Sequence, residues 1–126
     1  MKKVLIVEDH NDMHEVLIWQ VELMGFEAIS ARDGNEGLEK ALVEKPDLIL
    51  MDIMMPNQNG LDATRMLRAR AETKEIPILA ETALFSPSDL RKIMEAGCSG
   101  FIVKPFTFHE LQIKIRELIP ADEVNT

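Results

Sequence analysis

Short apolar runs alternate with longer amphipathic stretches along the whole of this 126-residue chain. Runs at 4–7, 48–51 and 76–82 have no helical period, which predicts strands buried on both faces of a sheet. Residues 26–31 alternate between apolar and polar types, as an edge strand does, and 100–104 are expected to form a short last strand. The pattern therefore predicts five strands.

Apolar residues spaced three and four positions apart predict a helix after each strand. These helices are expected at about 11–24, 35–45 and 61–73, from a start at 86–89, and at 107–119. Asn11 is the expected N-cap of the first helix, and the segment from Ser86 to Asp89 has the sequence of a capping box. Gly25 and Pro46 should end the first two helices, and Asp33-Gly34 should form a turn.

Five strands alternating with five helices predict an α/β fold, a (βα)5 doubly wound domain with a parallel sheet and right-handed crossovers. The less apolar second strand and the short fifth strand suit the sheet edges, which gives the order 2-1-3-4-5. This order places the switch point between strands one and three, where such sheets bind ligands. Residues 2–119 are expected to form this domain and 120–126 a C-terminal tail.

Composition narrows the class of protein. Hydrophobic residues make up 46% of the chain, which is enough for a core, and the net charge of −8 argues against direct binding of a nucleic-acid backbone. Cys98 is the only cysteine, so no internal disulfide can form. The apolar run at 4–7 is too short for a signal peptide, and no run reaches membrane-spanning length. We therefore expect a soluble cytoplasmic protein.

Carboxylates stand at the ends of the two strands that flank the switch point. Glu8 and Asp9 follow the first strand, and Asp52 interrupts the third before a turn expected at Pro56 and Gly60. Asp52 could be an ordinary solvated carboxylate, and Glu8 and Asp9 could be helix N-terminal charges. Together they would repel one another, which a hard divalent cation such as Mg²⁺ would relieve.

Two further strand ends point to the same rim of the sheet. Thr82 closes strand four and precedes the small Ala83, which should leave the hydroxyl free, and Lys104 closes strand five. Alone, each is an ordinary strand or surface residue. Beside a carboxylate and Mg²⁺, a hydroxyl and an ammonium would supply donors for phosphoryl oxygens. The set fits in-line phosphoryl transfer to an aspartate nucleophile.

Glu8-Asp9, Asp52 within Met-Asp-Ile-Met-Met-Pro, Thr82-Ala83 and Lys104-Pro105 resemble the motifs of the response-regulator receiver domain of two-component signalling. The resemblance runs from about Lys2 to Ile119 and implies the flavodoxin-like receiver fold. It implies that a histidine kinase or histidine phosphotransfer protein phosphorylates Asp52, and that the protein is a phosphoacceptor rather than an enzyme acting on other substrates. By the same resemblance, Mg²⁺ would be held by Glu8, Asp9, Asp52 and the Met54 backbone carbonyl. Thr82, Ala83 and Lys104 would bind the phosphoryl group, with Phe101 at the aromatic switch position.

The sequence departs from the usual receiver pattern in several places. Phe101 lacks the hydroxyl of the frequent tyrosine, so a switch there would be steric, and Glu81 puts a charge where an apolar residue is usual. Met54 and Leu84, two residues beyond Asp52 and Thr82, cannot orient a water strongly, so we expect slow hydrolysis of the phosphoryl group. No output domain follows Thr126, so the chain is either a stand-alone receiver or part of a longer regulator.

An output surface is also suggested. Strand alternation puts Phe101 and Val103 on one side of strand five, and Ile113 lies off the buried stripe of the last helix. With helix four they could form a partly apolar surface for self-association or a downstream target, although scattered apolar surface residues are normal.

Other polar and aromatic side chains are expected to have structural or surface positions without a role in the site. Arg65, Arg68 and Arg70 are expected to form a solvated helix face, Trp19 to pack at a helix margin, and His10, His14 and His109 to lie at the surface.

Three other functions are possible from the sequence. A receiver that binds partners without phosphorylation would keep the same residues. An aspartate-nucleophile phosphatase of the haloacid dehalogenase type would have a second aspartate where this chain has Met54. A flavodoxin-like electron carrier would have a phosphate-binding loop after strand one, where Glu8, Asp9 and His10 would instead repel phosphate.

Overall fold

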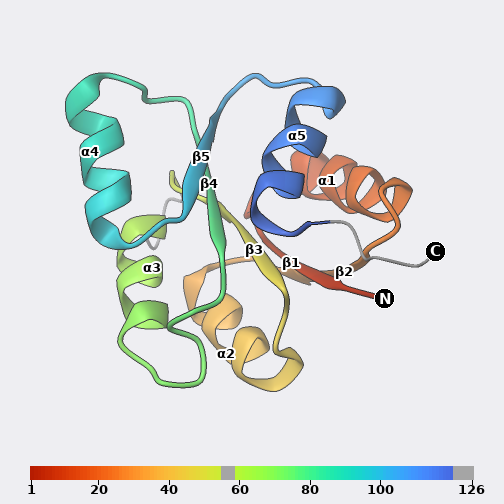
Figure 1. Cartoon of the computed structure of the whole chain (residues 1–126), viewed down its shortest axis with the longest axis horizontal. Coiled ribbons are helices and arrows are strands. Elements are labelled where there is room, and N and C mark those ends of the chain that lie inside the picture. Colours follow the sequence, from red (N-terminus) through yellow and green to blue (C-terminus); the bar gives the residue numbers. More distant parts are fainter. Residues whose placement is uncertain (55–58, 121–126) are drawn as a thin grey trace.

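A computed structural model describes residues 1–54 and 59–120 of the chain. Ten elements alternate in the predicted order: β1 Lys3–Val7, α1 Asn11–Leu23, β2 Glu27–Ala31, α2 Gly34–Glu44, β3 Leu48–Asp52, α3 Gly60–Arg68, β4 Ile78–Thr82, α4 Pro87–Ala96, β5 Gly100–Val103 and α5 Phe108–Leu118. The strands pair in parallel in the order β2-β1-β3-β4-β5 (Figure 1). The predicted α/β fold and strand order are therefore confirmed.

The sheet separates two hydrophobic cores. One core lies between the sheet and α2, α3 and α4, and the other lies between the sheet and α1 and α5 (Figure 1). Because side chains alternate along a strand, neighbouring strand residues contribute to opposite cores, as Leu50 and Met51 do on β3. All five residues of β3 are buried, as expected for a central strand of a parallel sheet.

The register of the sheet brings the functional strand ends to one edge. Val7 pairs with Met51, Asp52 with Glu81, and Thr82 with Val103. The residues that follow β1, β3, β4 and β5 therefore meet at the carboxyl end of the sheet, on both sides of the switch point.

Several element boundaries differ from the sequence prediction. His10, not Asn11, is the N-cap of α1, and its ring Nδ1 accepts a hydrogen bond from the Met13 N–H at 3.4 Å. Asp33 caps α2, so Gly34 begins that helix rather than completing a turn. In contrast, the capping box from Ser86 to Asp89 is confirmed.

The helix predicted at 61–73 ends at Arg68, and β4 begins only at Ile78. Arg68 was predicted to be solvated but instead ties the intervening loop to the loop before β5. Its guanidinium donates hydrogen bonds to the carbonyl oxygens of Gly97, Lys74 and Ile76 at 2.7–3.0 Å. The segment after Arg68 is therefore a loop held by these hydrogen bonds and not a continuation of the predicted helix.

The prediction for Trp19 on α1 is wrong, because this side chain is 62% exposed rather than packed at the margin of the helix. Pro56 and residues 121–126 of the expected tail lie outside the described residues. Within the described ranges, no helix has the length and apolar character needed to cross a membrane.

Candidate functional site

Three carboxylates converge at the switch point, as the strand ends predict. Glu8 and Asp52 are buried and Asp9 is half-buried. One carboxylate oxygen from each of these residues lies within 4.8 Å of the other two. Glu8 and Asp9 directly follow β1, and Asp52 is the last residue of the adjacent strand β3.

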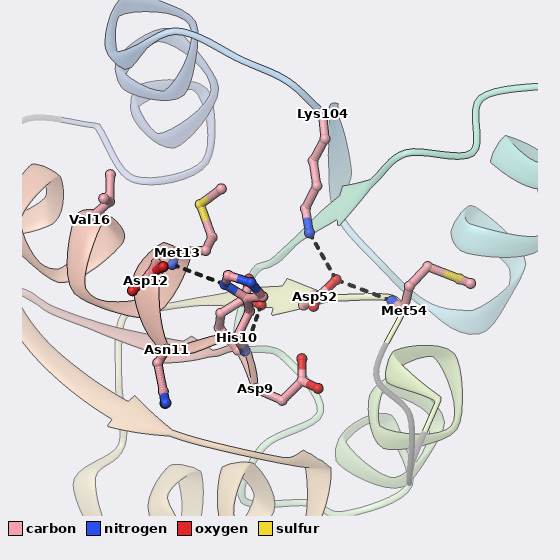
Figure 2. Close-up of a pocket in the computed structure, with 10 residues that line it drawn as sticks. Asp9, His10, Asn11, Asp12, Met13, Val16, Asp52, Met54 and Lys104 are labelled. Atoms are coloured by element: carbon pink, nitrogen blue, oxygen red, sulfur yellow. Dashed lines mark hydrogen bonds and ion pairs between the residues drawn. The ribbon is translucent and has the colours of Figure 1, made fainter.

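Lys104 reaches this cluster from the end of β5. Its Nζ lies 3.2 Å from Oδ1 of Asp52, and the backbone N–H of Met54 donates to the same oxygen at 3.1 Å (Figure 2). The cluster opens into a cleft of about 940 Å³ that extends along the first turns of α1 to Val16. Asp52 itself is buried, but it lines a cleft through which a phosphate donor could approach it.

Burial and like charge act together on the carboxylates. Burial raises the pKa of Glu8, the Asp52 carboxylate raises it further, and Lys104 partly opposes both, which leaves the pKa of Glu8 at about 7. Burial disfavours the charged form of Lys104, but the carboxylates of Asp52, Glu81 and Glu8 outweigh this effect and raise the pKa of Lys104. One ammonium is therefore set among several acidic groups.

The donor set fits a hard divalent cation such as Mg²⁺. Such ions take oxygen ligands, and the site offers three carboxylates at mutual distances compatible with a shared ion. Oε1 of Glu8 is buried and has no hydrogen-bond partner among the described residues. A cation would satisfy this oxygen and relieve the repulsion between Glu8 and Asp52.

Comparison with known proteins identifies the family of this arrangement. Residues 4–116 match the family described as the response regulator receiver domain. The chain belongs to this family. The family match confirms the predicted family, and the strand order confirms its flavodoxin-like fold. Receiver domains are phosphoacceptor domains of two-component signalling.

Individual relatives support this membership. The polar-differentiation response regulator DivK of Brucella anthropi is 39% identical over 106 residues, which cover 84% of this chain and 86% of that protein. The structure of the chemotaxis protein CheY4 of Vibrio cholerae has a TM-score of 0.90 at 30% identity, covering 94% of this chain and 99% of that one. The chain spans about half the length of other curated relatives, which are transcriptional regulators.

One relative bears on the cation. The receiver domain of the sensor histidine kinase PA1611 from Pseudomonas aeruginosa PAO1 was solved with a magnesium ion coordinated in its active-site cleft. That structure has a TM-score of 0.87 at 30% identity and covers 95% of this chain and 98% of its own.

The hydroxyl of Thr82 is not free in this receiver domain, contrary to the sequence prediction. It is buried and donates to the carbonyl oxygen of Leu84 at 2.9 Å, while the Leu84 N–H donates back to it at the same distance. The predicted openness is found instead at the exposed Ala83. A ligand of the Thr82 hydroxyl would therefore have to displace this local turn.

Glu81 is the least expected member of the site. It is fully buried, and neither carboxylate oxygen has a hydrogen-bond partner among the described residues. Its register partner is Asp52, and strand alternation places both side chains on the face covered by α1 and α5. Burial, reinforced by the charges of Glu8 and Asp52 and opposed by Lys104, raises the pKa of Glu81 to about 8.

Sequence reasoning missed His14, which was placed on the surface. It is only 2% exposed, and its Nδ1 lies 2.8 Å from the carbonyl oxygen of Glu8. The signal was its spacing, because His14, Leu17 and Val21 fall on one stripe of α1 and are its buried residues. His10 and His109 are exposed, as predicted.

Gly60 sets how closely α3 approaches the site. A Cβ atom there would lie 2.3 Å from the carbonyl oxygen of Asp52 and 2.8 Å from the Cα of Ile53. Only glycine fits such a contact without a shift of the backbone. The first residue of α3 is therefore packed directly against the end of β3.

The remaining predicted residues border the site or lie on β5 and α5. The side chains of Met54 and Leu84 are 58% and 45% exposed. Phe101 and Val103 are half-buried, and the Lys114 amine lies 5.7 Å from the centre of the Phe101 ring, within range of a cation–π contact. Ile113 is 46% exposed, off the buried stripe of α5 as predicted.

Proposed function

We propose that this receiver domain, within residues 2–119, accepts a phosphoryl group on Asp52 from a histidine kinase or a histidine phosphotransfer protein. The observation that carries the proposal is the position of Asp52. It ends β3 with Lys104 at 3.2 Å and two further carboxylates in reach, beneath an open cleft. A buried carboxylate with a cation beside it is a suitable nucleophile for phosphoryl transfer.

The transfer itself requires one bond to form and one to break. A carboxylate oxygen of Asp52 bonds to phosphorus as the bond from phosphorus to the leaving atom of the donor breaks, and its electron pair departs with the donor. Lys104 lies where its ammonium can bind an oxygen of the phosphoryl group, with the backbone at Ala83 as a further donor.

Glu8, Asp9, Asp52 and the backbone carbonyl of Met54 would hold Mg²⁺. The chemistry supplied by the bound ion is neutralisation of negative charge on the transferred group. Oε1 of Glu8 is buried without a hydrogen-bond partner in the part of the chain that the structure describes, and this oxygen and the raised pKa of Glu8 support a cation at this position.

Output would follow from rearrangement at Thr82. For its hydroxyl to bind the phosphoryl group, its two hydrogen bonds with Leu84 must break, which would move the loop that leads into α4. Phe101 would respond sterically, because it has no hydroxyl to bond. Phe101, Val103 and Ile113 would then form, with α4, a surface whose binding of a downstream target or a second copy depends on phosphorylation.

Intact mass spectrometry tests the proposal directly. The protein is incubated with a small acyl phosphate and Mg²⁺, and we expect one added phosphoryl group that is lost on acid treatment. EDTA should abolish labelling, and so should Asp52→Asn, which keeps the shape of the side chain but removes the nucleophile. Labelling of Asp52→Asn at the parental level would refute the assignment of Asp52.

A further inference from the structure

His14 fastens the turn that carries two of the three acidic side chains. A carbonyl oxygen can only accept, so the 2.8 Å contact means that Nδ1–H of His14 donates to the oxygen of Glu8. The backbone N–H of His14 also donates to the carbonyl oxygen of His10 at 2.9 Å. Side chain and backbone of this one residue therefore hold both ends of the segment from Glu8 to His10.

The Glu8 and Asp9 side chains in this segment point toward one another's carboxylate oxygens. Consecutive side chains in a strand point to opposite faces of the sheet, but β1 ends at Val7, and carboxylate oxygens of Glu8 and Asp9 lie within 4.8 Å of each other. The chain has therefore left strand geometry here, and the peptide group that joins the two residues sets the direction of one side chain relative to the other. The carbonyl of this peptide belongs to Glu8, and it is the group that His14 holds.

The rest of the Glu8 backbone is already fixed. Its N–H donates to the carbonyl oxygen of Ala31 on β2 at 3.0 Å, and its carboxylate Oε2 accepts from the N–H of His10 at 3.2 Å, so among the described contacts the His14 bond is the one made to the Glu8–Asp9 peptide itself. Without a donor this buried carbonyl would lack a partner, and the peptide plane would be free to turn away. Asp9 would turn with it, and the three carboxylates would no longer converge.

We infer that His14 is a positioning residue for the cation site, acting through the Glu8–Asp9 peptide and not by touching the ion. This inference rests on the proposed Mg²⁺ site. Partners that orient metal ligands contribute about 10–100-fold to metal affinity in proteins generally. The hydrogen bond from Nδ1 is the only part of the imidazole that the inference requires.

Three variants separate that hydrogen bond from the volume of the ring. His14→Leu removes the donor and keeps an apolar side chain of similar size. His14→Asn restores an N–H at the place of Nδ1, because its amide nitrogen is attached to Cγ as Nδ1 is. His14→Gln carries its amide one carbon further, near the place of Nε2, and should not restore the bond. His109→Leu, on the exposed face of α5, is the matched control.

Mg²⁺ binding to the full chain is measured by isothermal titration calorimetry, with thermal unfolding in EDTA measured alongside. We expect the Kd for Mg²⁺ to rise about tenfold or more in His14→Leu and His14→Gln, and to stay within about threefold of the parent in His14→Asn. The Kd for Ca²⁺ should change less, because Mg²⁺ demands near-ideal octahedral geometry and Ca²⁺ tolerates a looser site.

Parental Mg²⁺ affinity in His14→Leu, or equal losses in His14→Asn and His14→Gln, would overturn the inference. Equal losses for Mg²⁺ and Ca²⁺ would also overturn it, because they would indicate general loosening of the protein. If His14→Leu fails to fold, the difference in Mg²⁺ Kd between His14→Asn and His14→Gln decides the question. A parent that binds no Mg²⁺ would overturn the proposed function itself, whereas a parent that binds Mg²⁺ beside an unaffected His14→Leu overturns only the role of His14.

Discussion

Glu81 should make the stability of this protein fall as pH rises. An unfolded chain ionises this carboxyl near its ordinary pKa of 4.5, whereas burial keeps it protonated in the folded protein up to a pKa of about 8. Between these values the folded state binds more protons than the unfolded state, so raising the pH favours unfolding. Below the lower value neither state is charged at Glu81, and above the higher value the penalty is complete.

The size of the effect follows from one pKa unit being worth about 1.4 kcal/mol. From about pH 5.5 to about pH 7.5 the group is ionised in the unfolded chain and largely protonated in the folded one. Glu81 should therefore lower the free energy of unfolding by about 3 kcal/mol over this interval. This is a large share of the stability of a small domain.

Glu81→Gln isolates the effect, because glutamine has nearly the shape of protonated glutamate but cannot ionise. Urea unfolding is followed by far-ultraviolet circular dichroism in EDTA, at several pH values. The stability of Glu81→Gln relative to the parent should increase by about 3 kcal/mol from about pH 5.5 to about pH 7.5. Glu95→Gln, at an exposed position on α4, should show no such trend. If the curves of Glu81→Gln and the parent run parallel in pH, then Glu81 is ionised in the folded protein and the reasoning is wrong.

Three further predictions concern other parts of the molecule. Arg68→Met should lower the free energy of unfolding by about 2–4 kcal/mol, because it leaves carbonyl groups in two loops without their donor; a loss below about 0.5 kcal/mol in urea unfolding would contradict this. Met54→Asn or Leu84→Glu should shorten the lifetime of the phosphorylated protein by about tenfold or more, since each supplies a polar group to orient water; label that decays no faster after donor removal in either variant would exclude shielding by these side chains. Val103→Glu or Ile113→Glu should abolish phosphorylation-dependent association measured by size-exclusion chromatography with light scattering, and association unchanged in both would remove the proposed surface.

The fold was predictable because burial dictates the pattern of residue types. Strands that are covered on both faces are apolar over most of their length, with Glu81 on β4 as an exception, and the helices between them carry one apolar stripe. The carboxyl ends of parallel strands share an edge, so Glu8, Asp9, Asp52 and Lys104 could be brought together from their places after strands alone. The distances between these side chains could be obtained only from the structure.

What could not be predicted depends on contacts between distant segments or on the direction of single groups. Arg68 has the sequence context of a surface residue, and only the path of two loops gives its guanidinium carbonyl partners. The Thr82 hydroxyl bonds within its own loop, a choice that residue type does not determine. His14 differs, because its spacing on the buried stripe of α1 was present in the sequence and was outweighed by its polarity.

The division of the interior into two cores by the sheet has a consequence for how the protein can change over generations. The described buried residues form two separate clusters, one under α2, α3 and α4 and one under α1 and α5, so substitutions on opposite sides should combine almost additively, while those on one side should depend on each other. One layer can thus be remodelled while the other keeps its packing. Asp52 and Lys104 stand at strand ends between the two layers, so the acidic site constrains the sheet and, in each layer, the helix position that packs against it: Gly60 on α3 and His14 on α1.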